Sequence, residues 1–265
     1  MFKVSLLNRV VGATITGAGS DPAYPAANAA SPDRPFQPWK STDLGGHALV
    51  VDFGAAVTLD TIALIRTNFA TPVIYGNATD SWGAPSYSQT VTVGRNLISS
   101  RYHHVHAIVG SFNYRYLRIQ IQPQSTLDGA SVYLLGGIWA GVWTVPPRGF
   151  RWGYALDRIE PVLDQRTLSG ALHRLRLGEP IAHATAQRQA LLTTSPPGLN
   201  DQLAAWAEFD RKMADADSTL VWWEPTDPAQ GWIMRRLAPP AWTVGSKKLA
   251  EGSFELEEII AGGGA

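Results

Sequence analysis

The stretch NDQLAAWAEFDRKMAD at residues 200–215 is the one segment of this chain with a sustained helical period. At intervals of four, three and seven come Leu199, just before the stretch, then Leu203, Trp206 and Met213, with Phe209 beside them. Residues at these spacings share one face of a helix, so they form a single apolar stripe. Asn200 suits the N-cap, because its side-chain oxygen can accept a free backbone N–H of the first turn. The pattern predicts one amphipathic helix packed on a sheet.

Before this helix, from residue 13 to 143, strand patterns alternate with turn residues. Ala48–Phe53 and Tyr114–Ile121 alternate apolar and polar side chains, as expected of strands with one buried face. Thr61–Ile65 is more continuously apolar and is predicted to be a central strand. Val91–Val93 and Val132–Leu135 are further short candidates. Short strands with Gly, Pro, Asn and Asp between them favour an antiparallel β-sandwich or barrel.

A second domain is predicted to follow Val145–Gly149, where two prolines and a glycine interrupt the pattern. We therefore divide the chain into residues 1–145 and 146–265. Before the helix, three strands are expected, at Arg158–Asp164, Gly170–Leu177 and Ile181–Leu192. Gly178-Glu179-Pro180 is a turn signal, so the last two are expected to form a long hairpin. Closing strands are expected at Ser218–Trp223, Gln230–Leu237 and Phe254–Ile260.

Composition excludes several classes of function. Of 265 residues, 45% are hydrophobic and ten are tryptophan, which suffices for real cores. Lys plus Arg equal Asp plus Glu at 22 each, so we expect no specific nucleic-acid binding. The absence of cysteine excludes disulfides, thiolate zinc sites and cysteine nucleophiles. No apolar run approaches the length of a membrane-spanning helix, so no membrane insertion is expected.

No motif for catalysis or cofactor binding stands out in the sequence. There is no G-x-S-x-G nucleophile elbow, and Gly17-Ala18-Gly19 lacks the third glycine and the helix of a dinucleotide-binding loop. A pair of glycosidase carboxylates cannot be read from spacing, because the partners can be far apart in sequence. We therefore predict no enzyme activity, no catalytic residue and no cofactor.

Two groups of residues in the sequence have side chains that can bind metal ions. His104 and His106 would share one face of a strand, beside His103, as zinc ligands do, but no acidic third ligand is near in sequence. An exposed strand or loop end is the preferred interpretation of this histidine cluster. A structural calcium could use Asp21, Asp33 and Asp43, although the calcium-loop pattern D-x-D-x-D-G is absent. The prediction is that no metal is bound.

A glycan site is better motivated by the sequence. Trp39, Trp82 and Tyr87 lie in predicted loops, where an aromatic face can stack on a sugar ring. Arg66 and Asn68 leave the end of a predicted strand and can supply hydrogen bonds. These five residues are the candidate binding site. The alternative is that the aromatic side chains fold inward and contribute to the core.

Several segments of the N-terminal half occur in an order typical of one domain family. They are ATIT at 13–16, YPAANA at 24–29, PWKST at 38–42, LVVDFG at 49–54, TLDTIALIRTN at 58–68 and YRYLRIQI at 114–121. The chain here resembles discoidin-type domains, which are galactose-binding-like jelly rolls. The resemblance implies a β-sandwich with ligand-holding loops at one end. Many extracellular members carry a disulfide that this chain lacks. NATDSWGAPSY at 77–87 resembles phage-encoded members.

The C-terminal half has a long hairpin, a helix, and then the aromatic-rich LVWWEP at 220–225, and it ends near SFELEEI at 253–259. It resembles the α+β split-barrel unit of phage tail-tube and distal-tail proteins, with one main helix. This implies a mainly β structural protein of a phage tail tip or baseplate, located in the virion and assembled in the host cytoplasm. It would form a homo-oligomeric ring with tube, hub and tape-measure proteins as partners.

The alternative function is a glycan-binding module that recognises a cell-surface glycan. Such a module would be a host-recognition lectin or the accessory domain of a carbohydrate-active enzyme. Binding of defined glycans, and the genes that neighbour this one, would distinguish the two interpretations.

Overall fold

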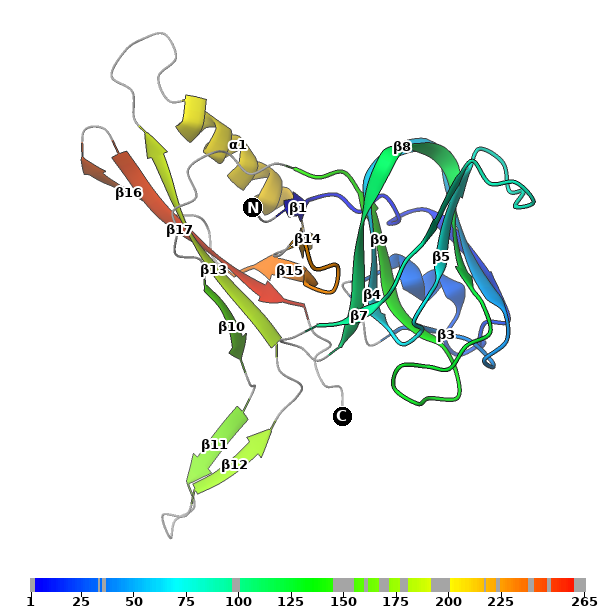
Figure 1. Ribbon diagram of the computed structural model, residues 1–265. Coiled ribbons are helices and arrows are strands. Elements are labelled where there is room, and N and C mark those ends of the chain that lie inside the picture. Colours follow the sequence, from blue (N-terminus) through cyan, green and yellow to red (C-terminus); the bar gives the residue numbers. More distant parts are fainter. Residues whose placement is uncertain are drawn as a thin grey trace. The chain divides into compact units, whose positions relative to one another are not determined.

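The computed structural model describes residues 3–32, 34, 37–96, 101–144, 155–159, 162–166, 172–176, 181–191, 201–216, 218–222, 225–237, 241–246 and 249–259. The chain divides into two compact units, each described by itself below (Figure 1). The first comprises Met1–Thr144 and Thr219–Ile233, and the second comprises Val145–Ser218 and Met234–Ala265. The strand pairs with a described register are antiparallel, and the described residues hold one α-helix. The predicted mainly β fold class is confirmed.

The first unit is built almost entirely of strands. They are β1 (Lys3–Ser5), β2 (Thr14–Ala18), β3 (Trp39–Lys40), β4 (His47–Thr67), β5 (Val73–Asn77), β6 (Tyr87–Thr90), β7 (Gly94–Arg95), β8 (Tyr102–Ile121), β9 (Leu134–Gly141) and β14 (Thr219–Trp222). A short 3-10 helix, η1 (Ala26–Ala30), follows β2. β15 (Gly231–Arg236) begins in this unit and ends in the other.

The two longest strands, β4 and β8, connect the two layers of the first unit (Figure 1). They pair from His47↔Ile121 to Leu64↔His104, with register shifts near the middle. Register irregularities bend a strand pair, so each long strand passes from one sheet to the other. One layer is β2-β4-β8-β5-β6 and the other is β3-β9-β4-β8-β7. This is the expected two-layer antiparallel sandwich.

The predicted strands Ala48–Phe53 and Thr61–Ile65 are therefore two halves of β4. The first half alternates buried and partly exposed residues, whereas residues 61–65 are all buried. Thr61–Ile65 lies between β8 and β9, as predicted for a central strand. The difference between the halves arises because only the first half has one face open to solvent.

A single core fills the space between the layers. Its large, fully buried members include Trp39, Leu49, Ile62, Leu64, Phe69, Ile74, Phe112 and Tyr133. Burial of each such side chain contributes roughly 1.5–3 kcal/mol.

Val91–Val93 contributes to burial without forming the predicted strand. Val91 and Val93 are both buried, and their N–H groups donate to the carbonyls of Pro72 and Ala70. These two isolated hydrogen bonds hold the segment in place but do not make a ladder. Of the predicted strand at Val132–Leu135, only Leu134 and Leu135 lie in β9.

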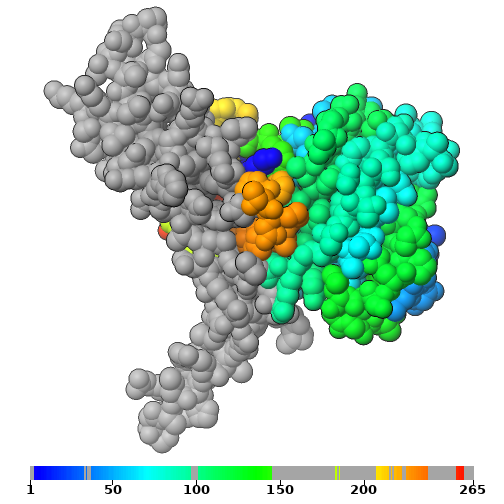
Figure 2. Space-filling view, viewed as in Figure 1, coloured from blue at the N-terminus to red at the C-terminus, as the bar shows by residue number. Residues whose placement is uncertain are grey.

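Residues 219–233 pack with the first unit, although the sequence assigns them to a domain 146–265. β14 pairs with β1, with Lys3 opposite Trp222. The Pro228 carbonyl accepts a hydrogen bond from Val105 N at 2.8 Å, and the Ala229 carbonyl accepts one from Asn96 Nδ2 at 2.9 Å. Figure 2 shows this segment, in orange, against the green surface of the sandwich. Because of these long-range hydrogen bonds, residues 219–233 belong to the first unit and not to the predicted domain 146–265. The predicted boundary at Val145–Gly149 lies outside the described residues.

Two stacked indoles and a lysine join the start of the chain to β14. The rings of Trp143 and Trp222 stack with their centroids 5.7 Å apart. Lys3 Nζ lies 5.6 Å from the first ring centroid and 5.4 Å from the second. A cation over an indole face is attracted by the ring quadrupole. The cluster Lys3–Trp143–Trp222 therefore holds together three segments that are distant in sequence.

The second unit contains β10 (Ala155–Ile159), β11 (Val162–Arg166), β12 (Leu172–Arg176), β13 (Ile181–Leu191), β16 (Ala241–Ser246), β17 (Leu249–Glu258) and the helix α1 (Asp201–Asp215). β13 pairs with β10 and β17, and β17 also pairs with β16 and with the end of β15. β11 pairs with β12.

The predicted hairpin of Gly170–Leu177 with Ile181–Leu192 is wrong. β12 and β13 exist, but β12 pairs with β11 while β13 pairs with β10. The strand predicted at Arg158–Asp164 is likewise divided between β10 and β11. The physical reason is that the outer pair, β10 with β13, encloses the inner pair, β11 with β12. The chain therefore reverses direction between β11 and β12 to form a hairpin, and β12 does not pair with β13. The turn signal Gly178-Glu179-Pro180 lies outside the described residues.

The predicted helix is confirmed as α1, which lies beside β13. Phe209 and Met213, both members of the predicted stripe, are buried. Glu208, on the solvent-exposed face of the helix, accepts hydrogen bonds from Arg211 and forms an ion pair with Lys212. The side chains of Leu203 and Trp206, and the N-cap Asn200, lie outside the described residues. No helix among the described residues has the length and apolar character needed to cross a membrane.

Candidate functional site

The outer face of the β2-β4-β8 sheet carries small and polar side chains in register. One row across the strands is Thr16, Val50 and Arg118, and the next is Ala18, Ala48 and Gln120. The residues between them, such as Leu49 and Ile119, point into the core and are fully buried. Because side chains alternate along a strand, the inward apolar set fixes this outward set. The alanines leave space beside the much longer Arg118.

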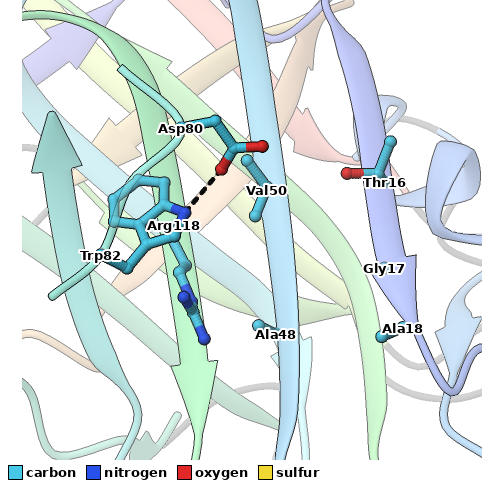
Figure 3. Close-up of a pocket in the computed structure, with 8 residues that line it drawn as sticks. All are labelled: Thr16, Gly17, Ala18, Ala48, Val50, Asp80, Trp82 and Arg118. Carbon is cyan, nitrogen blue, oxygen red and sulfur yellow. Dashed lines mark hydrogen bonds between the residues drawn. The ribbon is translucent and has the colours of Figure 1, made fainter. Parts of the chain in front are cut away.

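This space is a hollow of about 490 Å³ on the surface of the first unit. It is lined by Thr16, Gly17, Ala18, Ala48, Val50, Asp80, Trp82 and Arg118. Figure 3 shows Trp82 and Arg118 on one side, the β2 residues on the other, and Ala48 and Val50 between them. We call it the sheet-face hollow. It combines an apolar floor with a few polar groups, which is typical of small-molecule sites.

Trp82 reaches the hollow from the loop between β5 and β6, and local hydrogen bonds shape that loop. Asn77 Nδ2 donates to the Ser81 carbonyl at 2.6 Å, and Ser86 Oγ donates to Asn77 Oδ1 at 3.1 Å. Trp82 Nε1 donates to Asp80 Oδ1 at 2.6 Å. The ring centroid of Trp82 lies 6.3 Å from that of Tyr75. The indole is therefore held both at its nitrogen and beside a neighbouring ring.

Arg118 lies next to Trp82, with its guanidinium carbon 5.5 Å from the indole centroid. Its Nη2 donates a hydrogen bond to Gln120 Oε1. Its Nε is buried and has no hydrogen-bond partner in the described part of the chain. No ion pair is found for Arg118 among the described residues, in contrast to Arg115, whose Nε lies 2.7 Å from Asp52 Oδ1. The guanidinium thus retains donors beside the hollow.

Of the five candidate residues from sequence, Trp82 alone lines the sheet-face hollow. Trp39, expected in a loop, lies in β3 and is fully buried, with Nε1 donating to Ser20 Oγ at 2.8 Å. Asn68 is also buried. Its side-chain amide donates hydrogen bonds to Asp128 and to the Val132 carbonyl, and it accepts one from Leu134 N. Both side chains are used within the fold and have no face open to a sugar, which corrects that prediction.

Arg66 and Tyr87 are partly buried and lie away from the hollow. Arg66 has a φ of 53°, a left-handed conformation, and its N–H donates to His103 Nδ1 at 3.4 Å. The Tyr87 hydroxyl lies 2.6 Å from His106 Nε2, and burial raises the pKa of Tyr87. Sequence reasoning missed Asp80 and Arg118. The signal for Arg118 was present, because it occupies an outward position of the alternating strand Tyr114–Ile121.

The histidine cluster is largely buried, which corrects the expected exposed strand or loop end. His103 and His104 lie in β8, and the Nε2 atoms of both have no hydrogen-bond partner among the described residues. Burial lowers the pKa of His103 to about 3, aided by the nearby charges of Arg101 and Arg66. Burial also lowers the pKa of His104 to about 4. These histidines are therefore neutral parts of the core.

Possible metal ligands are dispersed in the described residues. No group of three or more His, Asp or Glu side chains there could hold a metal ion. Asp21 accepts a hydrogen bond from Ala23 N, and Asp43 accepts from Gly45 N and contacts His47. Both carboxylates thus shape their own turns. Asp33 lies outside the described residues.

Comparisons with solved structures find similarity over about half of the chain. Chitosan-binding module 1 from a chitosanase/glucanase of Paenibacillus sp. IK-5 is 16% identical, with 51% of this chain and 98% of that chain covered and a TM-score of 0.39. The family 32 carbohydrate-binding module of C. perfringens NanJ, in complex with galactose, is 11% identical, with coverages of 54% and 100% and a TM-score of 0.40. The lectin domain of lectinolysin, complexed with Lewis B antigen, is 11% identical, with coverages of 51% and 95% and a TM-score of 0.39.

No family model matches the chain, and a search of curated proteins finds no match. At the identities and TM-scores above, the similar structures carry no functional argument. Function has to be argued from the chain's own residues.

Proposed function

We propose that the first unit is a carbohydrate-binding module and that the sheet-face hollow is its binding site. The observation that carries this proposal is the position of Trp82, a fixed indole at the side of an open hollow with an apolar floor. A sugar ring has an apolar face of C–H groups and a rim of hydroxyls. Trp82 and Val50 match the face, while Asp80, Arg118 and Thr16 match the rim.

The indole is well suited to this role because its orientation is set before a ligand arrives. Its hydrogen bond to Asp80 and its contact with Tyr75 restrict rotation of the side chain. A preorganised group loses little conformational entropy on binding, so more of the contact energy appears as affinity. The alternative of an inward-folded ring, which holds for Trp39, does not hold for Trp82, which lines the surface hollow.

Replacement of Trp82 by alanine tests the proposal. We expect Trp82→Ala to weaken binding to the best ligand of a glycan array by at least about tenfold, since loss of a central aromatic contact typically costs 2 kcal/mol or more. The measurement is titration calorimetry on the full chain, with thermal unfolding to verify the fold.

Tyr24→Ala is the matched control. Tyr24 is also a partly exposed aromatic residue of the first unit, with Lys40 Nζ 3.7 Å from its ring centroid, but it does not line the hollow. Its replacement should leave affinity unchanged. Equal affinity of Trp82→Ala and wild type would remove the hollow as the binding site, and an array without any bound glycan would refute the proposed function.

A structural role in a phage tail tip is the second candidate function. The observation that favours it is the β11–β12 pair, whose strands pair only with each other in the described part of the chain. An isolated two-stranded ribbon is marginally stable in water, so a neighbouring subunit would stabilise it. The partners would be further copies in a ring and tube, hub or tape-measure proteins, and the location would be the virion tail.

Analytical ultracentrifugation of the full chain, alone and with a candidate tube protein, tests this second role. We expect a closed oligomer in at least one of the two samples. A monomer in both, together with slow hydrogen exchange in Val162–Arg166, would show that the ribbon is stable without a partner and would count against the tail-tip role.

A further inference from the structure

The polar groups on either side of Trp82 have opposite hydrogen-bonding characters. We propose that the sheet-face hollow selects an uncharged saccharide through a donor–acceptor pair: Arg118 donates to one ligand hydroxyl and Asp80 accepts from an adjacent one. This inference rests on the proposed function, because it assigns the ligand chemistry of the same hollow. It makes Asp80 and Arg118 the residues that determine specificity, with Trp82 as the common stacking surface.

Asp80 has two tasks in this arrangement. One carboxylate oxygen, Oδ1, accepts the indole N–H of Trp82 at 2.6 Å and so orients the ring (Figure 3). The side chain is exposed, and among the described residues Oδ2 has no hydrogen bond. An ionised carboxylate offers about four lone-pair sites on its two oxygens. Asp80 can therefore hold Trp82 and accept a ligand hydroxyl at the same time.

Arg118 supplies the donors. A guanidinium carries five N–H groups, and Nη2 of Arg118 uses one of them for Gln120 Oε1. The orphan Nε is buried, so a ligand in the hollow would meet the Nη groups. The guanidinium lies over the Trp82 ring at 5.5 Å. A sugar stacked against the Trp82 indole beside Arg118 would thus have donors and an acceptor within reach of neighbouring hydroxyls.

The balance of charge favours an uncharged ligand. Arg118 and Asp80 are the two charged residues that line the hollow, and their charges are opposite. Arg115, on the same strand as Arg118, is already paired with Asp52 at 2.7 Å. A ligand carboxylate or sulfate would be attracted by Arg118 but repelled by Asp80, and an ammonium would meet the reverse. No net charge is available to offset the desolvation of a charged sugar.

A glycan array with three defined classes tests the ligand class on the full chain. The classes are neutral oligosaccharides, uronate or sulfated oligosaccharides, and amino-sugar oligosaccharides. We expect binding in the neutral class and a dissociation constant that stays within about twofold when salt is raised from about 0.05 to about 0.5 M, since screening affects charged ligands. Binding confined to a charged class would overturn this inference while the proposed function stands. Binding in no class would overturn both.

Asp80→Asn tests the donor–acceptor pair itself. The asparagine keeps an oxygen for Trp82 Nε1 but places an NH2 donor where Oδ2 accepts, so the ligand hydroxyl loses its acceptor. We expect affinity for the best neutral glycan to fall by about tenfold or more, because the ligand hydroxyl loses its charge-assisted bond to the carboxylate and would have to turn to accept from the amide instead. The tryptophan fluorescence and the Tm should match those of the wild type, which shows that the indole stays in place.

Two arginine variants complete the test. Arg118→Met removes the donors and should reduce affinity as much as Asp80→Asn does, whereas Arg115→Met is the matched control outside the hollow and should bind as the wild type does. If Asp80→Asn and Arg118→Met both bind with wild-type affinity while Trp82→Ala does not, the hollow binds sugar but the donor–acceptor pair is wrong. In that case the proposed function stands and the inference falls.

Discussion

Replacing Trp222 by alanine should lower the free energy of unfolding of the first unit by about 3–5 kcal/mol. Trp222 is 4% exposed, its ring stacks on Trp143, and its Nε1 donates to the Asp227 carbonyl at 2.9 Å. The substitution leaves a cavity, removes the stack and deprives Lys3 of one of its two aromatic partners. Stability losses of this size correspond to a fall in Tm of roughly 6–20 °C for a domain of this length.

Differential scanning calorimetry of the full chain measures the fall in Tm that Trp222→Ala causes. Trp222→Phe is the control, because it keeps an aromatic ring against Trp143 and should lose much less. A Tm within a degree or so of wild type for the alanine variant would mean that β14 is not needed by the first unit. The assignment of Thr219–Ile233 to that unit would then be wrong.

Acid should destabilise the first unit at a higher pH than its carboxylates alone would require. His103 and His104 have folded-state pKa values of about 3 and about 4, against an ordinary value of 6.5. Below pH 6.5 the unfolded chain binds protons at these histidines and the folded chain does not. Stability is therefore complete above pH 6.5 and falls progressively as the pH approaches 4.

Thermal unfolding from pH 6.5 down to about pH 4 tests this expectation. The double variant His103→Gln/His104→Gln cannot take up these protons, so its Tm should change less over the same range. The comparison uses the slope of Tm against pH, which stays informative even if the variant is less stable throughout. A wild-type Tm that is constant over this range, or equal slopes for the two proteins, would contradict the role assigned to the buried histidines.

Local pattern in the sequence predicted the elements better than it predicted their partners. The helix at 201–215 and the alternation in Tyr114–Ile121 are local properties, and both are present in the structure. The pairing of β13 with β10, across the whole of β11 and β12, is a property of more distant contacts, so the turn signal at Gly178-Glu179-Pro180 misled. The return of Thr219–Ile233 to the first unit likewise depends on β1, at the other end of the chain.

The candidate site shows the same limit. Trp82 was found because a loop aromatic residue is a recognisable signal, and it lines the hollow. Asn68 was misjudged because its amide is consumed by Asp128, Val132 and Leu134, which lie far along the chain. Arg118 becomes a candidate only once the register places it between Val50 and Tyr75. Register depends on pairing across the whole sheet, which no single segment specifies.

The position of β1 brings the place where the chain leaves the first unit next to the place where it returns. Val4 forms an isolated bridge with Thr144 and pairs with Val221, so β1 lies between the residue at which the chain leaves the unit and the strand by which it returns. Neighbouring strands lie about 4.8 Å apart, which places exit and re-entry roughly 10 Å from each other. The first unit therefore closes on itself beside β1, and none of its described strand pairs involves residues 145–218. The length of residues 145–218 can therefore change without breaking a described strand pair of the sandwich.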